Sequence, residues 1–209
     1  MTARTVLALT TAMTVALVSN AAAQTKMTLR PESNVVVEGG SNVHEWSCKA
    51  TGFTATVEMD SAYTTSFTAT ARPIGKVVVT IPTKSLRCGK DKMDENTWKA
   101  LRADEFKEIR YELTDYRLDA AKSTPESFAA VTKGKLTVAG TTKEVEMPLT
   151  ATRLAGGQMK GAGSLPLLMT DVGIKPPTAL LGTLRTKNAI TISFEVLLDR
   201  STVVALLQK

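Results

Sequence analysis

Few side chains in this sequence could perform chemistry. It contains one histidine, His44, and two cysteines, Cys48 and Cys88. A catalytic triad would have to use His44, but no GxSxG or similar nucleophile motif accompanies it, and a lone histidine in a strand is usually structural. One histidine and two cysteines also fall short of the three or four ligands of a zinc site. We therefore predict no enzyme, no metal site and no cofactor, and keep a hydrolase that uses His44 as the least favoured alternative.

The N-terminal segment has the pattern of a secretory signal peptide. Arg4 is followed by an apolar run at residues 6–18, and the alanines at 21–23 form a typical signal-peptidase site. The run is shorter than the roughly 20 apolar residues that cross a bilayer, which disfavours an uncleaved membrane anchor. We predict a signal peptide at residues 1–23, one domain at residues 24–209, and a periplasmic or secreted protein.

Export changes what the two cysteines are expected to do. Cys48 and Cys88 are too far apart for a CxxC redox motif. An even number of cysteines in an oxidising compartment favours a disulfide over two buried free thiols. A bond between them would close a loop of about 40 residues and stabilise the fold by roughly 3–4 kcal/mol. We predict this bond.

The formal charge of +6 restricts the class of partner. Lysines and arginines are scattered singly among acidic residues, and no basic stripe is interleaved with aromatic residues. This pattern favours a solvated surface and no nucleic-acid binding. A weak attraction to an anionic ligand head and a transient membrane contact stay open, and the composition gives no indication of an oligomeric state.

Most of the chain alternates between apolar and polar residues, which is the period of half-buried β-strands. The last such segment, residues 189–199, places Ile190, Ile192 and Phe194 on one face. The other predicted strands cover residues 53–60, 76–82 and 108–116, and a hairpin covers residues 135–150 with its turn at 139–142. Strands repeated in this way favour an all-β protein, a single antiparallel β-barrel, over an open sheet with bare edges. A barrel of about eight strands encloses either packed side chains or one small ligand.

One segment, residues 93–106, has a helical pattern instead. Asp94 is the predicted N-cap, and Trp98 and Leu101 share one face at a spacing of three residues. The acidic pairs of this segment are interpreted as complements of the helix dipole rather than as an acid/base dyad. We therefore predict one short helical insertion in the barrel.

Residues 173–186 connect two predicted strands yet contain Pro176 and Pro177. Proline cannot donate a ladder hydrogen bond, so this pair is expected outside a paired strand. An irregular connection with Leu180 and Leu181 either plugs one end of the barrel as core or covers its mouth. Both interpretations stay open from the sequence.

Four segments resemble the YceI-like polyisoprenoid-binding proteins. They are SNVVVEGGSNVHEWSCKATGF, a strand–loop–helix segment that starts VTIPTKSLRCGK, the hairpin GKLTVAGTTKEVEMPL and the closing run MTDVGIKPPTALLGTLRTKNAITISFEVLL. The hairpin and the closing run are the most specific parts, and the resemblance covers residues 33–198. It implies a lipocalin-like antiparallel β-barrel with an elongated apolar cavity for a long isoprenoid chain. It implies neither a cofactor nor catalysis.

The predicted function is that of an exported lipid-binding protein that sequesters or carries a long-chain isoprenoid-like ligand inside the barrel. Large and small residues are mixed on the inward faces, so a structural or interaction barrel with a filled core and no ligand remains the main alternative. An anionic head on the ligand is expected to meet Lys175 or Arg185 beside the proline segment. The residues predicted to contact the ligand are inward-facing strand residues and apolar residues of the proline segment: Phe53, Val57, Val79, Val138, Met147, Ile174, Leu180 and Phe194.

Overall fold

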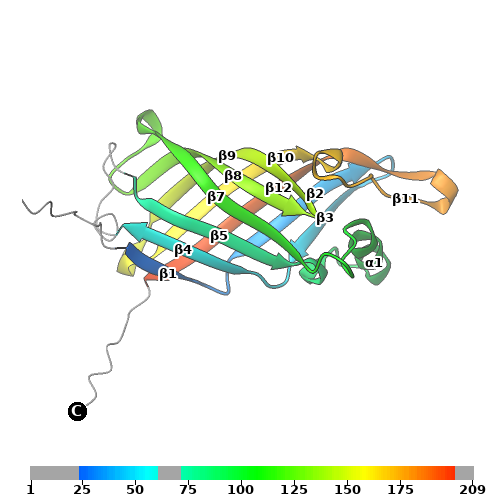
Figure 1. The fold of residues 1–209 in the computed structure, drawn as a ribbon, viewed down its shortest axis with the longest axis horizontal. Helices are drawn as coiled ribbons and strands as arrows, with labels where there is room; N and C mark the ends of the chain where they lie inside the picture. The colour runs from blue at the N-terminus through cyan, green and yellow to red at the C-terminus, as the bar shows by residue number, and fades with distance from the viewer. Residues whose placement is uncertain (1–23, 61–71, 201–209) are drawn as a thin grey trace, which may run out of the picture.

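The protein is an antiparallel β-barrel with one α-helix, as the sequence predicts (Figure 1). The computed structural model describes residues 24–60 and 72–200, so the predicted signal peptide lies outside the described residues. The strands are β1 (Gln24–Leu29), β2 (Asn34–Ser41), β3 (Glu45–Ala50), β4 (Thr54–Asp60), β5 (Ile74–Pro82), β6 (Leu86–Arg87), β7 (Glu108–Asp119), β8 (Ser127–Val138), β9 (Thr141–Arg153), β10 (Met159–Leu168), β11 (Thr178–Ala179) and β12 (Leu184–Arg200). The helix is α1 (Asp91–Ala100), and the short 3₁₀ turns are η2 (Thr83–Ser85), η3 (Ala120–Lys122), η4 (Ala155–Gly157), η5 (Met169–Val172) and η6 (Leu180–Gly182). In the described ranges no helix is long and apolar enough to cross a membrane.

Eight strands close into a ring in the order β1, β4, β5, β7, β8, β9, β10 and β12. The ring closes where β1 pairs with the end of β12, from Met27 opposite Arg200 to Leu29 opposite Leu198. The first part of the 17-residue β12 pairs instead with β2, and β3 and β6 follow β2. Closure gives each ring strand a partner on both sides, which removes the bare edges of an open sheet.

The alternating sequence pattern fills the inside of the barrel with two groups of apolar side chains. One group lies where β1 joins β12 and includes Met27, Tyr116 and Phe128. The other lies at the opposite end, beside α1, and includes Leu101 and Val172. We call these two ends of the barrel the β1 end and the α1 end.

Helix α1 begins earlier and ends earlier than predicted. Its N-cap position is Lys90, so the prediction that Asp94 is the N-cap is wrong. Asp94 lies inside the first turns with its side chain buried, and its carboxylate accepts a hydrogen bond from the backbone amide of Cys88 at 2.6 Å. The helix stops before Arg102, whose φ of 49° is incompatible with a right-handed helix.

The hairpin between β8 and β9 has a tighter turn than predicted. Only Ala139 and Gly140 separate the two described strands, and both have positive φ, 48° and 81°. Positive φ at both positions defines the two-residue turn that matches the twist of the paired strands. Thr141 and Thr142, which were predicted to lie in the turn, therefore belong to β9.

The proline segment projects from the α1 end. Pro176 and Pro177 lie outside the strands, as predicted. The chain then forms β11, which pairs with the start of β12, and this hairpin extends beyond the barrel (Figure 1). Ile174 is buried in the apolar group of the α1 end, whereas Leu181 is fully exposed at the tip of the hairpin. Leu181 therefore does not plug the barrel.

Candidate ligand-binding cavity

A cavity of about 660 Å³ occupies the inside of the barrel, and its walls are mostly apolar. This volume falls within the roughly 300–1,000 Å³ that is typical of small-molecule sites. At the β1 end the lining includes the buried side chains of Met59, Phe128 and Met159. At the α1 end the lining includes the exposed residues His44 and Lys90, so the cavity reaches the surface there. The barrel is hollow rather than filled.

Aromatic side chains leave this space free because they lie against glycines of other strands. The pairs are Trp46 with Gly39, Tyr111 with Gly134 and Phe194 with Gly163. In each pair the ring occupies the place that a Cβ atom of the glycine would need. A glycine in a strand interior commonly marks such a close approach. The three rings can therefore lie along the wall of the barrel instead of crossing it.

The polar groups deep in the cavity are neutral and hydrogen-bonded. The Tyr111 hydroxyl donates to Thr132 Oγ1 at 3.5 Å, and the Thr132 hydroxyl donates to the Met147 carbonyl at 2.9 Å. Burial raises the pKa of Tyr111, although the hydrogen bond to Thr132 opposes this shift. An apolar chain that enters the interior therefore does not have to displace water from a charged side chain.

The charged side chains of the lining lie at the opening. Among the described residues they are Lys90 and Lys92, and no acidic side chain lines the cavity. Lys92 pairs with Glu95 at 3.0 Å, and Lys90 makes no ion pair with any residue that the structure describes. Lys175 and Arg185, which were expected to meet an anionic head, do not line the cavity. The basic side of the opening is therefore formed by the start of α1.

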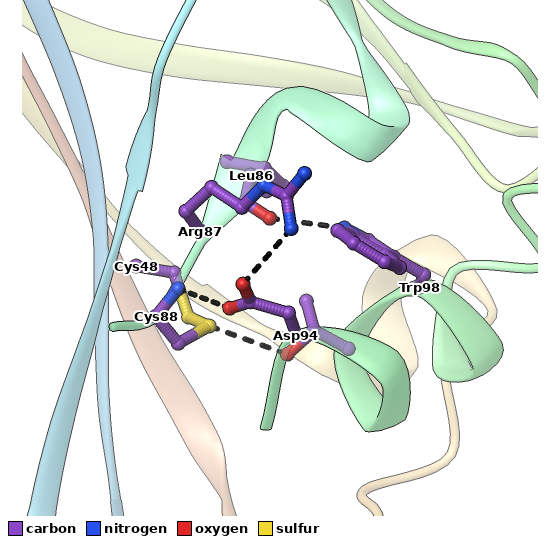
Figure 2. The surroundings of a disulfide bond; sticks show 7 residues. Cys48, Leu86, Arg87, Cys88, Asp94 and Trp98 are labelled. Atoms are coloured by element: carbon purple, nitrogen blue, oxygen red, sulfur yellow. Dashed lines mark hydrogen bonds and ion pairs between the residues drawn. A yellow bond between two sulfur atoms is a disulfide. The ribbon is translucent and has the colours of Figure 1, made fainter. Parts of the chain in front are cut away.

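A disulfide bond joins this side of the opening to the barrel wall (Figure 2). It links Cys48 of β3 to Cys88, which precedes α1, and confirms the predicted pair. Cys48 is itself buried and contributes to the cavity lining. The bond therefore fixes the start of α1 next to the cavity.

Hydrogen bonds around the disulfide hold α1 in one orientation (Figure 2). Besides the Cys88 amide, the buried carboxylate of Asp94 accepts a hydrogen bond from Arg87 at 3.2 Å. The Arg87 guanidinium stacks over the ring of Trp98 at 4.4 Å from its centroid. The indole of Trp98 donates to the carbonyl of Leu86 at 3.0 Å. The helix is thus attached to β6 through its own side chains.

The predicted ligand-facing residues come together in the cavity wall. Those whose side chains the structure describes all line it: Phe53, Val57, Val79, Val138, Met147, Ile174 and Phe194. The side chain of Leu180 lies outside the described residues. Contact of these residues with a ligand remains a prediction.

Sequence reasoning missed the part of the wall formed by β2, β3 and α1. Val35, Val37 and Trp46 line the cavity from the two strands, and Met93 and Leu101 line it from the helix. The alternation in β2 was obscured because a third valine separates Val35 from Val37. Trp46 could have been found from its place opposite Gly39 only with the strand register known.

His44 lies at the opening without a catalytic partner. Among the described residues its imidazole forms no hydrogen bond. The nearby Ser41 hydroxyl donates instead to the His44 carbonyl at 2.9 Å and accepts the backbone amide of His44 at 3.0 Å. A serine nucleophile needs a hydrogen bond to its base, and this arrangement does not provide one. The hydrolase alternative gains no support from the geometry.

Fold and cavity together define a small lipocalin-like barrel whose cavity opens at the α1 end. The family model of the YceI-like domain matches residues 23–198, and the chain therefore belongs to this family. This result confirms the resemblance found in the sequence. No curated protein matches the chain.

Solved structures of three bacterial proteins share the fold. BcnA of Burkholderia cenocepacia has 18% sequence identity and a TM-score of 0.62, covering 79% of this chain and 96% of BcnA. A polyisoprenoid binding domain from Saccharophagus degradans, implicated in plant cell wall breakdown, has 11% identity and a TM-score of 0.60, covering 84% and 97%. The YCEI protein of Campylobacter jejuni has 16% identity and a TM-score of 0.53, covering 96% and 98%. At these identities the similarity is one of fold.

Proposed function

We propose that the protein is an exported carrier that holds a long isoprenoid-like chain inside the barrel. The observation that carries this proposal is the apolar cavity, which runs from buried residues at the β1 end to exposed residues at the α1 end. Burial of apolar surface contributes about 25 cal/mol per Å², so an extended hydrocarbon chain can bind without polar anchors. The ligand named for the Saccharophagus degradans domain supports the choice of an isoprenoid.

The position of the charged residues orients the ligand in this proposal. An unpaired charge in the interior would cost several kcal/mol. An anionic head therefore stays at the opening, where Lys90 and Lys92 lie and no described acidic residue lines the wall. The chain end of the ligand points toward the β1 end.

Export is supported by the disulfide and by the N-terminal pattern. The Cys48–Cys88 bond fits an oxidising compartment. The sequence of residues 1–23 fits a signal peptide that is removed. The proposed function requires no catalytic residue and no cofactor.

A cavity-filling variant tests the binding site. Val79 lines the middle of the cavity, whereas its neighbour Val78 does not line it. Protein stripped of lipid is titrated with a polyprenyl lipid while the melting temperature is measured, because a ligand that binds the folded state raises it. We expect the wild type and Val78→Trp to be stabilised and Val79→Trp to lose the effect. If polyprenyl lipids leave the wild-type melting temperature unchanged, the proposed ligand class is wrong.

A further inference from the structure

The exposed apolar side chains gather at one end of the barrel. Among the described residues, the large hydrophobic side chains that are exposed are Val43, Leu168 and Leu181, with exposed fractions of 71%, 43% and 109%. Val43 lies in the β2–β3 hairpin and Leu181 lies at the tip of the β11–β12 hairpin. Leu168 lies opposite Ala189, near the start of β12. All three residues are at the α1 end, where the cavity opens.

Two of these residues lie on hairpins that are bonded to each other. The Asn42 side chain donates from Nδ2 to the Thr183 carbonyl at 2.9 Å and accepts the Arg185 amide through Oδ1 at 2.9 Å. These bonds connect the residue before Val43 to the strand that follows Leu181. Figure 1 shows the β11–β12 hairpin extending past the barrel. Val43 and Leu181 therefore belong to one projecting surface.

Folding does not account for a leucine at position 181. Its side chain is fully exposed, so it gains no packing. Its φ of 55° lies in the left-handed region, which leucine rarely adopts and asparagine tolerates better. An apolar residue that gains neither packing nor a favourable backbone conformation, beside other exposed apolar residues, indicates a surface that a partner covers.

Positive charge lies on the segment that carries Leu181. Residues 173–188 contain Lys175, Arg185 and Lys187 and no acidic residue. Lys187 pairs with Glu45 at 3.1 Å, whereas Lys175 and Arg185 form no ion pair within the part of the chain that the structure describes. Across the opening, Asp91 and Glu95 accompany Lys90 and Lys92 at the start of α1, although neither acidic residue lines the cavity.

We propose that the α1 end docks on the surface of a bilayer that contains anionic phospholipids. Leu181 and Val43 enter the interfacial layer, and Lys175 and Arg185 contact lipid phosphates. Exposed apolar side chains next to unpaired cations are the combination that binds anionic interfaces. The cavity opening then faces the bilayer, so a hydrocarbon chain can pass between them with little exposure to water. Docking itself needs no ligand and goes beyond the carrier function.

Vesicle binding tests this docking directly. The protein, stripped of lipid, is sedimented with vesicles of phosphatidylcholine alone or of phosphatidylcholine with about a third phosphatidylglycerol. We expect binding to the anionic vesicles, weakened by added salt because salt screens exposed charges. We expect little binding to phosphatidylcholine alone.

A variant that removes the apolar contacts should weaken binding without unfolding the protein. Leu181→Asn combined with Val43→Thr replaces two exposed residues, and asparagine suits the left-handed backbone at position 181. The loss of their partial burial is expected to weaken vesicle binding roughly ten-fold. An unchanged melting temperature shows that the fold is intact.

A charge variant with a matched control tests the cations. Lys175→Gln with Arg185→Gln should weaken binding to anionic vesicles roughly ten- to thirty-fold. Lys26→Gln with Lys76→Gln removes the same charge from exposed positions of β1 and β5 at the β1 end and should leave binding unchanged. Equal weakening by both pairs would mean that net charge, not this surface, binds the vesicles. Failure of the wild type to bind anionic vesicles at low salt, with polyprenyl lipid binding retained, would overturn docking alone.

Discussion

Phe194 of β12 lies directly across from Gly163 of β10, and its ring occupies the space that a side chain at position 163 would need. A Cβ atom added to Gly163 would lie 2.7 Å from the Phe194 ring and 2.6 Å from the carbonyl oxygen of Pro148. The ring can move into the cavity, but the backbone oxygen cannot give way without a shift of the strand. The absent side chain at position 163 thus keeps a large aromatic residue flat on the wall of a hollow barrel.

Gly163→Ala should therefore destabilise the fold by about 1–3 kcal/mol, the usual cost of overpacking a core. Gly52→Ala is the matched control, because an added Cβ there meets no atom within 4 Å. The control should change the free energy of unfolding by less than about 0.5 kcal/mol. Urea unfolding of both variants measures the difference. Equal stabilities would contradict the role given to Gly163.

The raised pKa of Tyr111 predicts that the fold loses stability in alkaline solution. Burial raises its pKa above the ordinary value of 10.0, so the folded state keeps the proton that the unfolded state loses. The stability from this group is fully present below pH 10 and is lost as the pH rises from there through the raised pKa. Unfolding free energies between pH 8 and pH 11 should fall more steeply for the wild type than for Tyr111→Phe, which has no hydroxyl proton to lose. Parallel profiles would show that Tyr111 does not titrate differently in the two states.

The Cys48–Cys88 disulfide should be complete in protein purified from its native compartment. Intact-mass analysis after alkylation without reductant should show no added label on Cys48 or Cys88. The double variant Cys48→Ala with Cys88→Ala should lose roughly 3–4 kcal/mol of stability, because the unfolded chain regains the freedom of a loop of about 40 residues. Two labels on the native protein would rule the bond out in solution.

The N-terminus of the mature protein tests export. Protein purified from its native compartment should begin at or near Gln24, after the alanines at 21–23. Edman sequencing or N-terminal peptide mass measures this. Material that begins at Met1 outside the cytoplasm would contradict cleavage of a signal peptide.

The barrel could be predicted because its strands carry a local signal. Alternation in residues 53–60, 76–82 and 189–199 identifies strands without knowledge of their partners. The same alternation explains why Val79 and Phe194 were placed correctly on the inward face. A closed antiparallel sheet then follows from the need to protect edges.

The opening could not be predicted, because it depends on contacts between distant residues. The β1 end forms where β1 pairs with the end of β12. The opening lies at the α1 end, where the disulfide between Cys48 and Cys88 attaches α1 to the barrel wall. Asp94 was mistaken for an N-cap because its carboxylate accepts hydrogen bonds from the Cys88 amide and Arg87, six and seven residues earlier in the chain, and not from the first turn of its own helix. Lys90 and Lys92 were not recognised as the basic side of the opening because the disulfide to Cys48, a distant residue, brings the start of α1 to the cavity.

Organic-solvent extraction of the folded protein from its native source, followed by mass spectrometry, tests most directly which molecule occupies the cavity. We predict a long-chain isoprenoid-like lipid in near-stoichiometric amount, because the cavity has mostly apolar walls and opens beside Lys90 and Lys92. An extract without lipid, from a protein that also fails to bind added polyprenyl lipids, would contradict the carrier function.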